Sequence, residues 1–122
     1  MAVEPDSAAL QRFGEDDDRE SLVLVQLLRF AEGGRERYLE YSAAAQRLLA
    51  GVGAQVLYAG ECIEPLWAPQ GGGWDAVVLV RYPNRAAYLE MLAHPAYQEI
   101  APLRRSALRE AALLPMNDWP GR

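Results

Sequence analysis

Two segments of the chain are hydrophobic at both odd and even positions. They are residues 21–30 (SLVLVQLLRF) and 74–82 (WDAVVLVRY). Successive side chains of a strand point to opposite faces of a sheet, so each segment is predicted to be a strand that is buried on both sides. The less continuous apolar segments 54–63 and 110–114 are predicted to be two further strands. The segment 64–73, rich in proline and glycine, is predicted to be a hairpin excursion.

Two other regions place apolar residues at steps of three and four, which is typical of a helix with one buried face. The first helix is predicted over 35–52, with the recurring residues Tyr38, Tyr41, Ala45, Leu48, Leu49 and Val52. Asn84 is a suitable cap for a second helix that runs to Pro95, where the ring interrupts it. A further helical piece follows, and its expected apolar residues are Tyr97, Ile100, Leu103 and Leu108.

The order strand, helix, strand, strand, helix, strand indicates an α+β fold of the ferredoxin-like type, a βαββαβ antiparallel sheet with helices on one face. This domain is predicted over residues 21–116. Its other face would expose a contiguous apolar patch, which monomers rarely do. Covering apolar surface stabilises by about 25 cal/mol per Å². The simplest cover is the sheet of a second copy, so a homodimer through the sheet face is expected. Cover by the N-terminal arm alone is the alternative.

Charge is concentrated at the start of the chain. The net charge is −5, with twelve arginines, no lysine and seventeen acidic residues. Residues 1–20 hold seven of the acids and two of the arginines, and the remainder of the chain is balanced. No basic surface is expected for nucleic acid, and no apolar run of roughly 18 residues or basic amphipathic helix is present for a membrane. The absence of an N-terminal signal pattern predicts a cytoplasmic protein.

The ends of the chain are predicted to lie outside the domain. Residues 1–20 are expected to form a short helical arm and an acidic linker, and residues 117–122 to form a C-terminal tail. The arm holds few apolar residues, so it is expected to be dispensable for the fold.

The segment Trp74–Arg85 (WDAVVLVRYPNR) resembles the pattern WD-x-V-V-x-V-x-[FY]-P-[SN]-R of a bacterial family, domain-of-unknown-function family 1330. Downstream, Met91, the Pro-Ala-Tyr sequence that ends at Tyr97, and Arg104 are similar to that family's M…P-x-Y…R pattern. The order and spacing of these pieces make the resemblance more specific than any one of them.

The resemblance extends upstream of these motifs. Residues 25–30 (VQLLRF) are similar to the family's V-N-L-L-[KR]-[FY] strand, and Tyr38 with Tyr41 fits its Y-x-x-Y helix. The resemblance covers about 21–116, and one departure is Gln26, where the family has Asn. Membership would place the chain in the dimeric α+β barrel superfamily. That superfamily contains small monooxygenases, heme-degrading enzymes and ligand-sensing domains.

Polar groups that interrupt apolar elements are the candidates for a binding site, because burying them is costly unless they are satisfied or used. Gln26 stands in the middle of an apolar strand, and Arg81 is a cation suited to a carboxylate or enolate oxygen. His94 is the single histidine and therefore the candidate general base. We expect a cavity between the helices and the sheet, with the ligand-binding residues Gln26, Tyr58, Trp74 and Arg81, and with His94, Tyr97 and Arg104 near its mouth.

Each candidate also has a purely structural interpretation. Gln26 would be satisfied within the sheet region, Arg81 would pair with Glu61 or another acid, and His94 would cap a helix. Tyrosine and tryptophan side chains would belong to the core or to a dimer interface, with their polar tips hydrogen-bonded.

No motif for metal or cofactor chemistry is found in the sequence. The single cysteine, Cys62, and the single histidine provide no zinc or iron cluster, and no cofactor is expected. Three functions stay open. The protein binds or transforms a small apolar or aromatic molecule, at most as a cofactor-independent monooxygenase. Alternatively it is a non-enzymatic carrier or sensor of an apolar or anionic ligand, or a structural accessory dimer.

Overall fold

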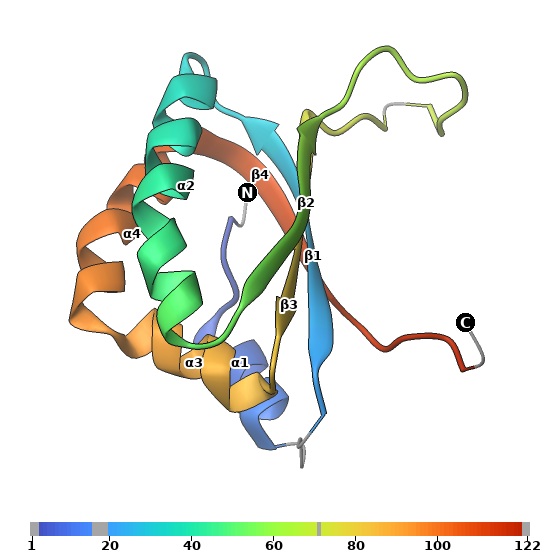
Figure 1. Ribbon diagram of the computed structural model, residues 1–122. Helices are drawn as coiled ribbons and strands as arrows, with labels where there is room; N and C mark the ends of the chain where they lie inside the picture. Colours follow the sequence, from blue (N-terminus) through green and yellow to red (C-terminus); the bar gives the residue numbers. More distant parts are fainter. Residues whose placement is uncertain (1–2, 16–19, 71, 121–122) are drawn as a thin grey trace.

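The helices and strands follow one another in the predicted order. The computed structural model describes residues 3–15, 20–70 and 72–120. Its elements are α1 (Ser7–Glu15), β1 (Leu22–Phe30), α2 (Gly34–Gly51), β2 (Gln55–Glu61), β3 (Ala76–Tyr82), α3 (Arg85–Ala93), α4 (Pro95–Ala107) and β4 (Leu108–Met116) (Figure 1). The α+β, ferredoxin-like prediction is confirmed, and the predicted break at Pro95 separates α3 from α4.

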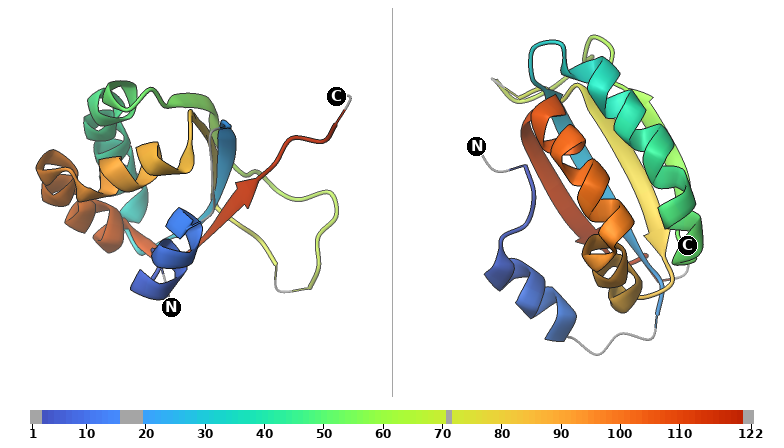
Figure 2. Two further views of the ribbon diagram at one scale, coloured as in Figure 1. Left: turned by 90° about the horizontal axis from the view of Figure 1, so that it is seen from below. Right: turned by 90° about the vertical axis from the view of Figure 1, so that its left-hand side faces the viewer.

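The strands form an antiparallel sheet in the order β2-β3-β1-β4. In the central pair, Leu24 lies opposite Val80 and Val25 lies opposite Leu79. Even-numbered residues of β1 and β3 therefore share one face of the sheet, and odd-numbered residues share the other. Helices α2 and α4 lie side by side over the even face (Figure 2). The core between them includes Leu24, Leu28, Val80 and Tyr82, all of which are buried.

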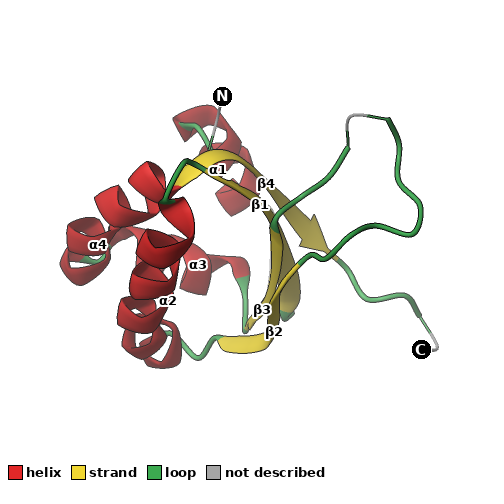
Figure 3. Ribbon diagram, turned by 90° about the horizontal axis from the view of Figure 1, so that it is seen from above, coloured by secondary structure: helices red, strands yellow, loops and turns green. Residues whose placement is uncertain are grey.

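The odd face of the sheet carries no helix, and we call it the open face. Its apolar residues come from three strands and are Val23, Val25, Leu27, Val77, Leu79, Ala112, Leu114 and Met116. Figure 3 shows α2, α3 and α4 on one side of the sheet, and the segments 62–70, 72–75 and 117–120 on the other. The two-sided apolarity seen in the sequence therefore corresponds to the two faces of the sheet, and helices of the same chain cover the even face.

Strand β4 is longer than the predicted 110–114 segment. It pairs with β1 from Phe30–Leu108 to Val23–Met116 and includes Pro115. Proline is tolerated there because β4 is an edge strand, where a missing backbone N–H removes no bond to a further strand. Pairing with the long β1 extends the strand beyond its local apolar run.

The described part of the N-terminal arm packs against the body of the protein. The ring of Phe13 meets Tyr88 edge-on at 5.9 Å, and the guanidinium of Arg85 stacks over Phe13 at 4.6 Å. Val3 and Leu10 pack against the core as well. These contacts argue against the expectation that the arm is dispensable. Residues 16–19 of the predicted acidic linker lie outside the described residues.

The first residue of α2, Gly34, has backbone atoms of α4 against its Cα. A Cβ at this position would overlap the carbonyl oxygen of Ala107 and lie 2.9 Å from its carbonyl carbon. Gly34→Ala should therefore lower the free energy of unfolding by roughly 1–3 kcal/mol, the usual cost of overpacking. Gly51, in the same helix, has nothing within 4 Å of such a Cβ. Gly51→Ala should be neutral or stabilise by up to about 1 kcal/mol. Urea denaturation compares the two variants, and equal stabilities would contradict this packing.

Candidate functional site

A cavity of about 700 Å³ lies between the even face of the sheet and the helices that cover it. Leu24, Gln26, Val78 and Val80 of the sheet contribute to its lining. Larger side chains at the buried positions of α2 and α4 would fill this space, but two of these positions hold the alanines Ala45 and Ala101. Small residues at buried positions of the two helices leave room between helix and sheet, and this room is the cavity.

The N-terminal arm forms one wall of the same cavity. Val3, Glu4 and Pro5 line it, as do Leu10 and Phe13 of α1. The arm runs along the β4 edge of the sheet (Figure 2). The cavity is therefore bounded by parts of the chain that lie about a hundred residues apart in sequence, as the hydrogen bond between Arg104 and Val3 shows directly.

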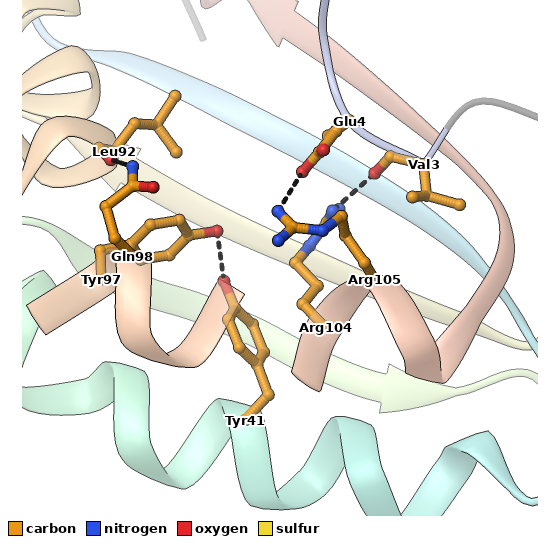
Figure 4. A network of polar contacts seen from close by, with 8 residues as sticks. All are labelled: Val3, Glu4, Tyr41, Leu92, Tyr97, Gln98, Arg104 and Arg105. Atoms are coloured by element: carbon orange, nitrogen blue, oxygen red, sulfur yellow. Dashed lines mark hydrogen bonds and ion pairs between the residues drawn. The ribbon is translucent and has the colours of Figure 1, made fainter. Parts of the chain in front are cut away.

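Arg104 is the buried charged residue of the site, with 8% of its surface exposed. It is buried because α4 turns one stripe toward the sheet, formed by Tyr97, Ala101, Arg104 and Ala107 at helical spacing. Its Nη1 donates to the carbonyl oxygen of Val3 at 2.5 Å, and its Nη2 donates to Oε1 of Gln26 at 3.2 Å. Among the described residues no carboxylate forms an ion pair with Arg104, and the nearby Glu4 pairs with Arg105 at 3.5 Å (Figure 4).

Tyrosine side chains surround this arginine. The hydroxyls of Tyr41 from α2 and Tyr97 from α4 share a hydrogen bond of 3.1 Å (Figure 4). Burial is the main cause that raises the pKa of Tyr38, Tyr41, Tyr82 and Tyr88 above the ordinary tyrosine value, and the positive charge of Arg104 opposes it in each case. These four phenols are therefore neutral near physiological pH.

The polar groups of the cavity are well suited to hold an acceptor oxygen. Arg104 brings a guanidinium into the cavity, and this group offers five N–H donors. The raised pKa keeps the phenols in the form that donates an O–H. Apolar and aromatic walls would contact the rest of a ligand, which is the usual composition of a small-molecule site.

The structure brings together three of the predicted site residues and separates four. Gln26, Tyr97 and Arg104 line the cavity. Arg81 does not, because it lies opposite Val23 on the open face of the sheet while Gln26 faces the helices. The placement of Arg81 in one site with Gln26 is therefore corrected. Arg81 forms an ion pair with Asp118 at 3.5 Å, whereas Glu61, its expected partner, pairs with Arg35.

Tyr58 and Trp74 also lie outside the cavity. The pairing of β2 with β3 shifts between Val56 and Tyr58, so this irregularity turns Tyr58 to the open face beside Leu79, and 58% of its surface is exposed. Trp74 precedes β3 and packs under the guanidinium of Arg29 at 4.4 Å from the ring centre. Both placements correct the predicted site, and neither residue belongs to the described core.

His94 acts as the N-cap of α4. Its Nδ1 accepts a hydrogen bond from the backbone N–H of Ala96 at 3.0 Å, and the residue is exposed. The helix-cap interpretation therefore holds, with the cap at the N-terminus of α4, and the placement of His94 at the mouth of the cavity is corrected. Among the described residues there is also no cluster of histidine, cysteine and acidic side chains that could hold a metal ion.

Sequence reasoning missed the tyrosines as a group. Tyr38 and Tyr41 were expected as members of a buried helix face and of the family's Y-x-x-Y pattern, and not as polar groups of a site. The available signal was their hydroxyl, because a buried phenol needs a partner and several such residues on facing helices predict a polar pocket within the core.

A family described as a domain of unknown function, DUF1330, matches residues 28–116 of the chain. The chain belongs to the DUF1330 family. This confirms the resemblance drawn from the strand and helix motifs. No curated protein sequence matches the chain.

Several solved structures share the fold of this DUF1330 protein. The RPA0582 protein of Rhodopseudomonas palustris, described as of unknown function, has a TM-score of 0.86 and 26% identity in its methylated form, over 99% of this chain and 98% of that one. A dimeric ferredoxin-like protein of unknown function from Bacteroides fragilis has a TM-score of 0.58 and 12% identity, over 80% and 96%. A putative antibiotic biosynthesis monooxygenase from Bacteroides thetaiotaomicron has a TM-score of 0.55 and 19% identity, over 84% and 94%. The last two show the fold alone.

None of the helices in the described ranges is both long and apolar enough to cross a membrane.

The buried tyrosines predict a loss of stability at alkaline pH. Their pKa is raised in the folded protein above the value of 10 that applies to the unfolded chain. Above pH 10 the unfolded chain therefore releases protons that the folded protein keeps, and rising pH favours unfolding. Below pH 10 the stability that the neutral buried tyrosines contribute is fully present. The chain has no lysine, so tyrosines dominate the titration in this range.

Urea denaturation between about pH 8 and about pH 11 measures this loss. The ultraviolet absorbance of phenolate should rise together with unfolding, and Tyr41→Phe should make the decline less steep. If the four phenols ionise while the protein stays folded, the account of their burial is wrong.

Proposed function

We propose that this protein binds a small apolar or aromatic molecule in the cavity between the sheet and helices α2 and α4. The observation that carries the proposal is the cavity itself, about 700 Å³ in volume, with apolar walls and a few convergent hydrogen-bond donors. Ligand sites commonly have volumes of about 300–1,000 Å³ and this mixture of residues.

The packing of the protein supports a ligand in this space. Well-packed cores leave few voids larger than a water molecule, and unfilled apolar volume destabilises the folded state. Ala45 and Ala101 keep the space open at the centre of two helix stripes, where larger residues would close it. A ligand that fills the cavity supplies the missing contacts.

The donors in the cavity suggest how binding would extend to a reaction. Groups that hold an acceptor oxygen also stabilise negative charge that develops on it, and they do so best when water is excluded. Arg104 and the neutral tyrosines would act in this way on a bound carbonyl or phenol. The protein is therefore proposed to be a binding protein first, whose site is compatible with a reaction driven by the ligand's own reactivity.

We further propose that a second copy of the chain covers the open face. Val25, Leu27, Val77 and Leu79 form the centre of this face, and related folds from Bacteroides fragilis and Jannaschia are described as dimeric. The ion pair Arg29–Glu110, at 2.6 Å, lies at one end of the apolar area. An apolar centre with a polar rim is the usual anatomy of a protein interface.

Exposed apolar side chains beside this face support the same arrangement. Ile63 and Trp67 of the 62–75 loop are 88% and 96% exposed, and Trp119 near the C-terminal end is 84% exposed. Figure 1 shows both segments projecting on the side of the sheet that faces away from α2 and α4. A second copy placed against the open face would meet them, and their burial would add to the interface.

A charge on the open face should separate the two copies. In Leu79→Asp, the symmetry of the dimer would bury the new carboxylate twice, and an unpaired buried charge costs several kcal/mol. Sedimentation velocity at micromolar concentration should show a dimer for the wild type and the 13.5 kDa monomer for the variant. Leu39→Asp, on the exposed side of α2, is the matched control and should stay dimeric. A monomeric wild type would refute the proposed assembly.

Filling the cavity should weaken ligand binding. N-phenyl-1-naphthylamine, a neutral aromatic probe that fluoresces in apolar surroundings, should bind the wild-type protein in the micromolar range. Val78→Phe adds volume to the cavity wall and should lower this affinity roughly tenfold, about 1.4 kcal/mol, because the probe and the new ring compete for the same space. Leu39→Phe, on the exposed helix surface, should bind like the wild type. Failure of the wild type to bind, or an unchanged affinity in Val78→Phe, would contradict the cavity as the site.

A further inference from the structure

We propose that the ligand of the cavity carries a single oxyanion, a carboxylate, enolate or phenolate oxygen, and that Arg104 binds it. The inference rests on the proposed function and adds the chemical class of the ligand. It differs from the sequence-based hypothesis, which assigned this role to Arg81.

The charge of Arg104 has no negative counterpart in the described part of the chain. Its hydrogen-bond partners, the carbonyl oxygen of Val3, Oε1 of Gln26 and the side chain of Tyr38, are neutral. A guanidinium is not deprotonated in proteins, so this side chain cannot escape its burial by becoming neutral. A buried charge is costly unless an opposite charge or a full set of hydrogen bonds compensates it. An anion in the cavity would provide that compensation.

The neighbouring phenols do not supply the charge. Tyr38 and Tyr41 are the tyrosines of α2 that line the cavity, and burial raises the pKa of both. Tyr41 is also held in a hydrogen bond to the hydroxyl of Tyr97. Both groups are therefore neutral and are not counterions for Arg104. The bond between Tyr41 and Tyr97 uses the O–H of one of them, and the other O–H can donate to a ligand oxygen.

The other charges of the cavity lining set the charge of the ligand. Among the described lining residues, the charged ones are Glu4, Arg104 and Arg105. Glu4 and Arg105 form an ion pair with each other and are both about half exposed. One positive charge therefore remains inside, and it matches a ligand with one negative charge.

The guanidinium is also held in place before a ligand arrives. Val3 and Gln26 accept from Nη1 and Nη2, and Tyr38 makes a third hydrogen bond, so three of the five N–H donors are used. These partners come from the arm, from β1 and from α2, which fixes the plane of the group from several sides. Gln26 and the arm are thus positioning elements, and the remaining donors are available to the oxyanion.

A purely structural role for Arg104 would be to tie the arm to α4 through Val3. The two roles differ in what they predict for charged and neutral ligands of the same shape. Only an anion-binding role makes the protein distinguish them, whereas a tether affects stability and both ligands alike.

The first test uses the wild-type protein. 2-Naphthoate and 2-naphthamide have the same aromatic body and differ in charge at neutral pH. Each is titrated against bound N-phenyl-1-naphthylamine, and naphthoate should displace the probe at a concentration at least about tenfold lower, as expected for a charge-assisted hydrogen bond. Equal displacement by the two compounds would overturn the inference, while the proposed cavity would stand. If N-phenyl-1-naphthylamine itself does not bind, the proposed function is refuted, whatever the charge of the ligand.

The second test assigns the preference to Arg104. Arg104→Met keeps most of the length of the side chain and removes its charge, and it should abolish the preference for naphthoate while the neutral probe still binds. Arg104→Lys keeps the charge and should retain part of the preference. Arg47→Met, at an exposed position of α2 outside the cavity lining, is the control and should behave like the wild type. Thermal unfolding of each variant shows whether it is folded.

The outcomes separate the two roles. If Arg104→Met is less stable and binds both compounds equally less well, Arg104 is a tether and the inference is wrong. If Arg104→Met does not fold, the preference for naphthoate over naphthamide is compared between Arg104→Lys and the wild type instead. A wild type without preference for the anion then refutes the proposal.

Discussion

The central strands β1 and β3 are apolar on both faces, and each face needs its own cover. Helices α2 and α4 cover the even face, where Leu24, Leu28 and Val80 are buried. The N-terminal arm closes the same layer at the β4 edge. The odd face has no cover within the described chain, and the most exposed apolar side chains of the described residues lie beside it. The proposed second copy and the proposed ligand site follow from these two faces separately.

On the helix side the cover is incomplete in a specific way. Alanines at the centre of α2 and α4 leave space, and Arg104 occupies a position on the helix stripe that would ordinarily be apolar. A guanidinium at such a place is stable only with acceptors around it, and the arm carbonyl of Val3 and the amide of Gln26 provide two. The arm therefore does more than extend the chain. It supports the polar centre of the core, which explains why a segment with few apolar residues is packed so closely.

The candidate site shows which steps of sequence reasoning have a physical basis. Gln26 was found because an amide in an apolar strand needs a partner, and its partner is Arg104. Arg81 was misplaced because the sequence does not reveal which parity of a two-sided apolar strand faces the helices. Tyr58 was misplaced because the irregularity of β2 next to Leu57 reverses the alternation for the residues that follow. A shift of one residue moves every later side chain to the other face of the sheet.

The sequence by itself determined the order of the elements, the two-sided apolarity of the central strands and the family. These depend on local periodicity, glycine and proline positions, and short motifs, which a single chain displays directly. Only the tertiary structure decided that Arg104 and not Arg81 is the cation of the cavity, and that Val3 and Gln26 are its partners. Those contacts join the arm, β1 and α4, and their geometry depends on strand register and helix rotation, which are set by packing between segments far apart in the chain.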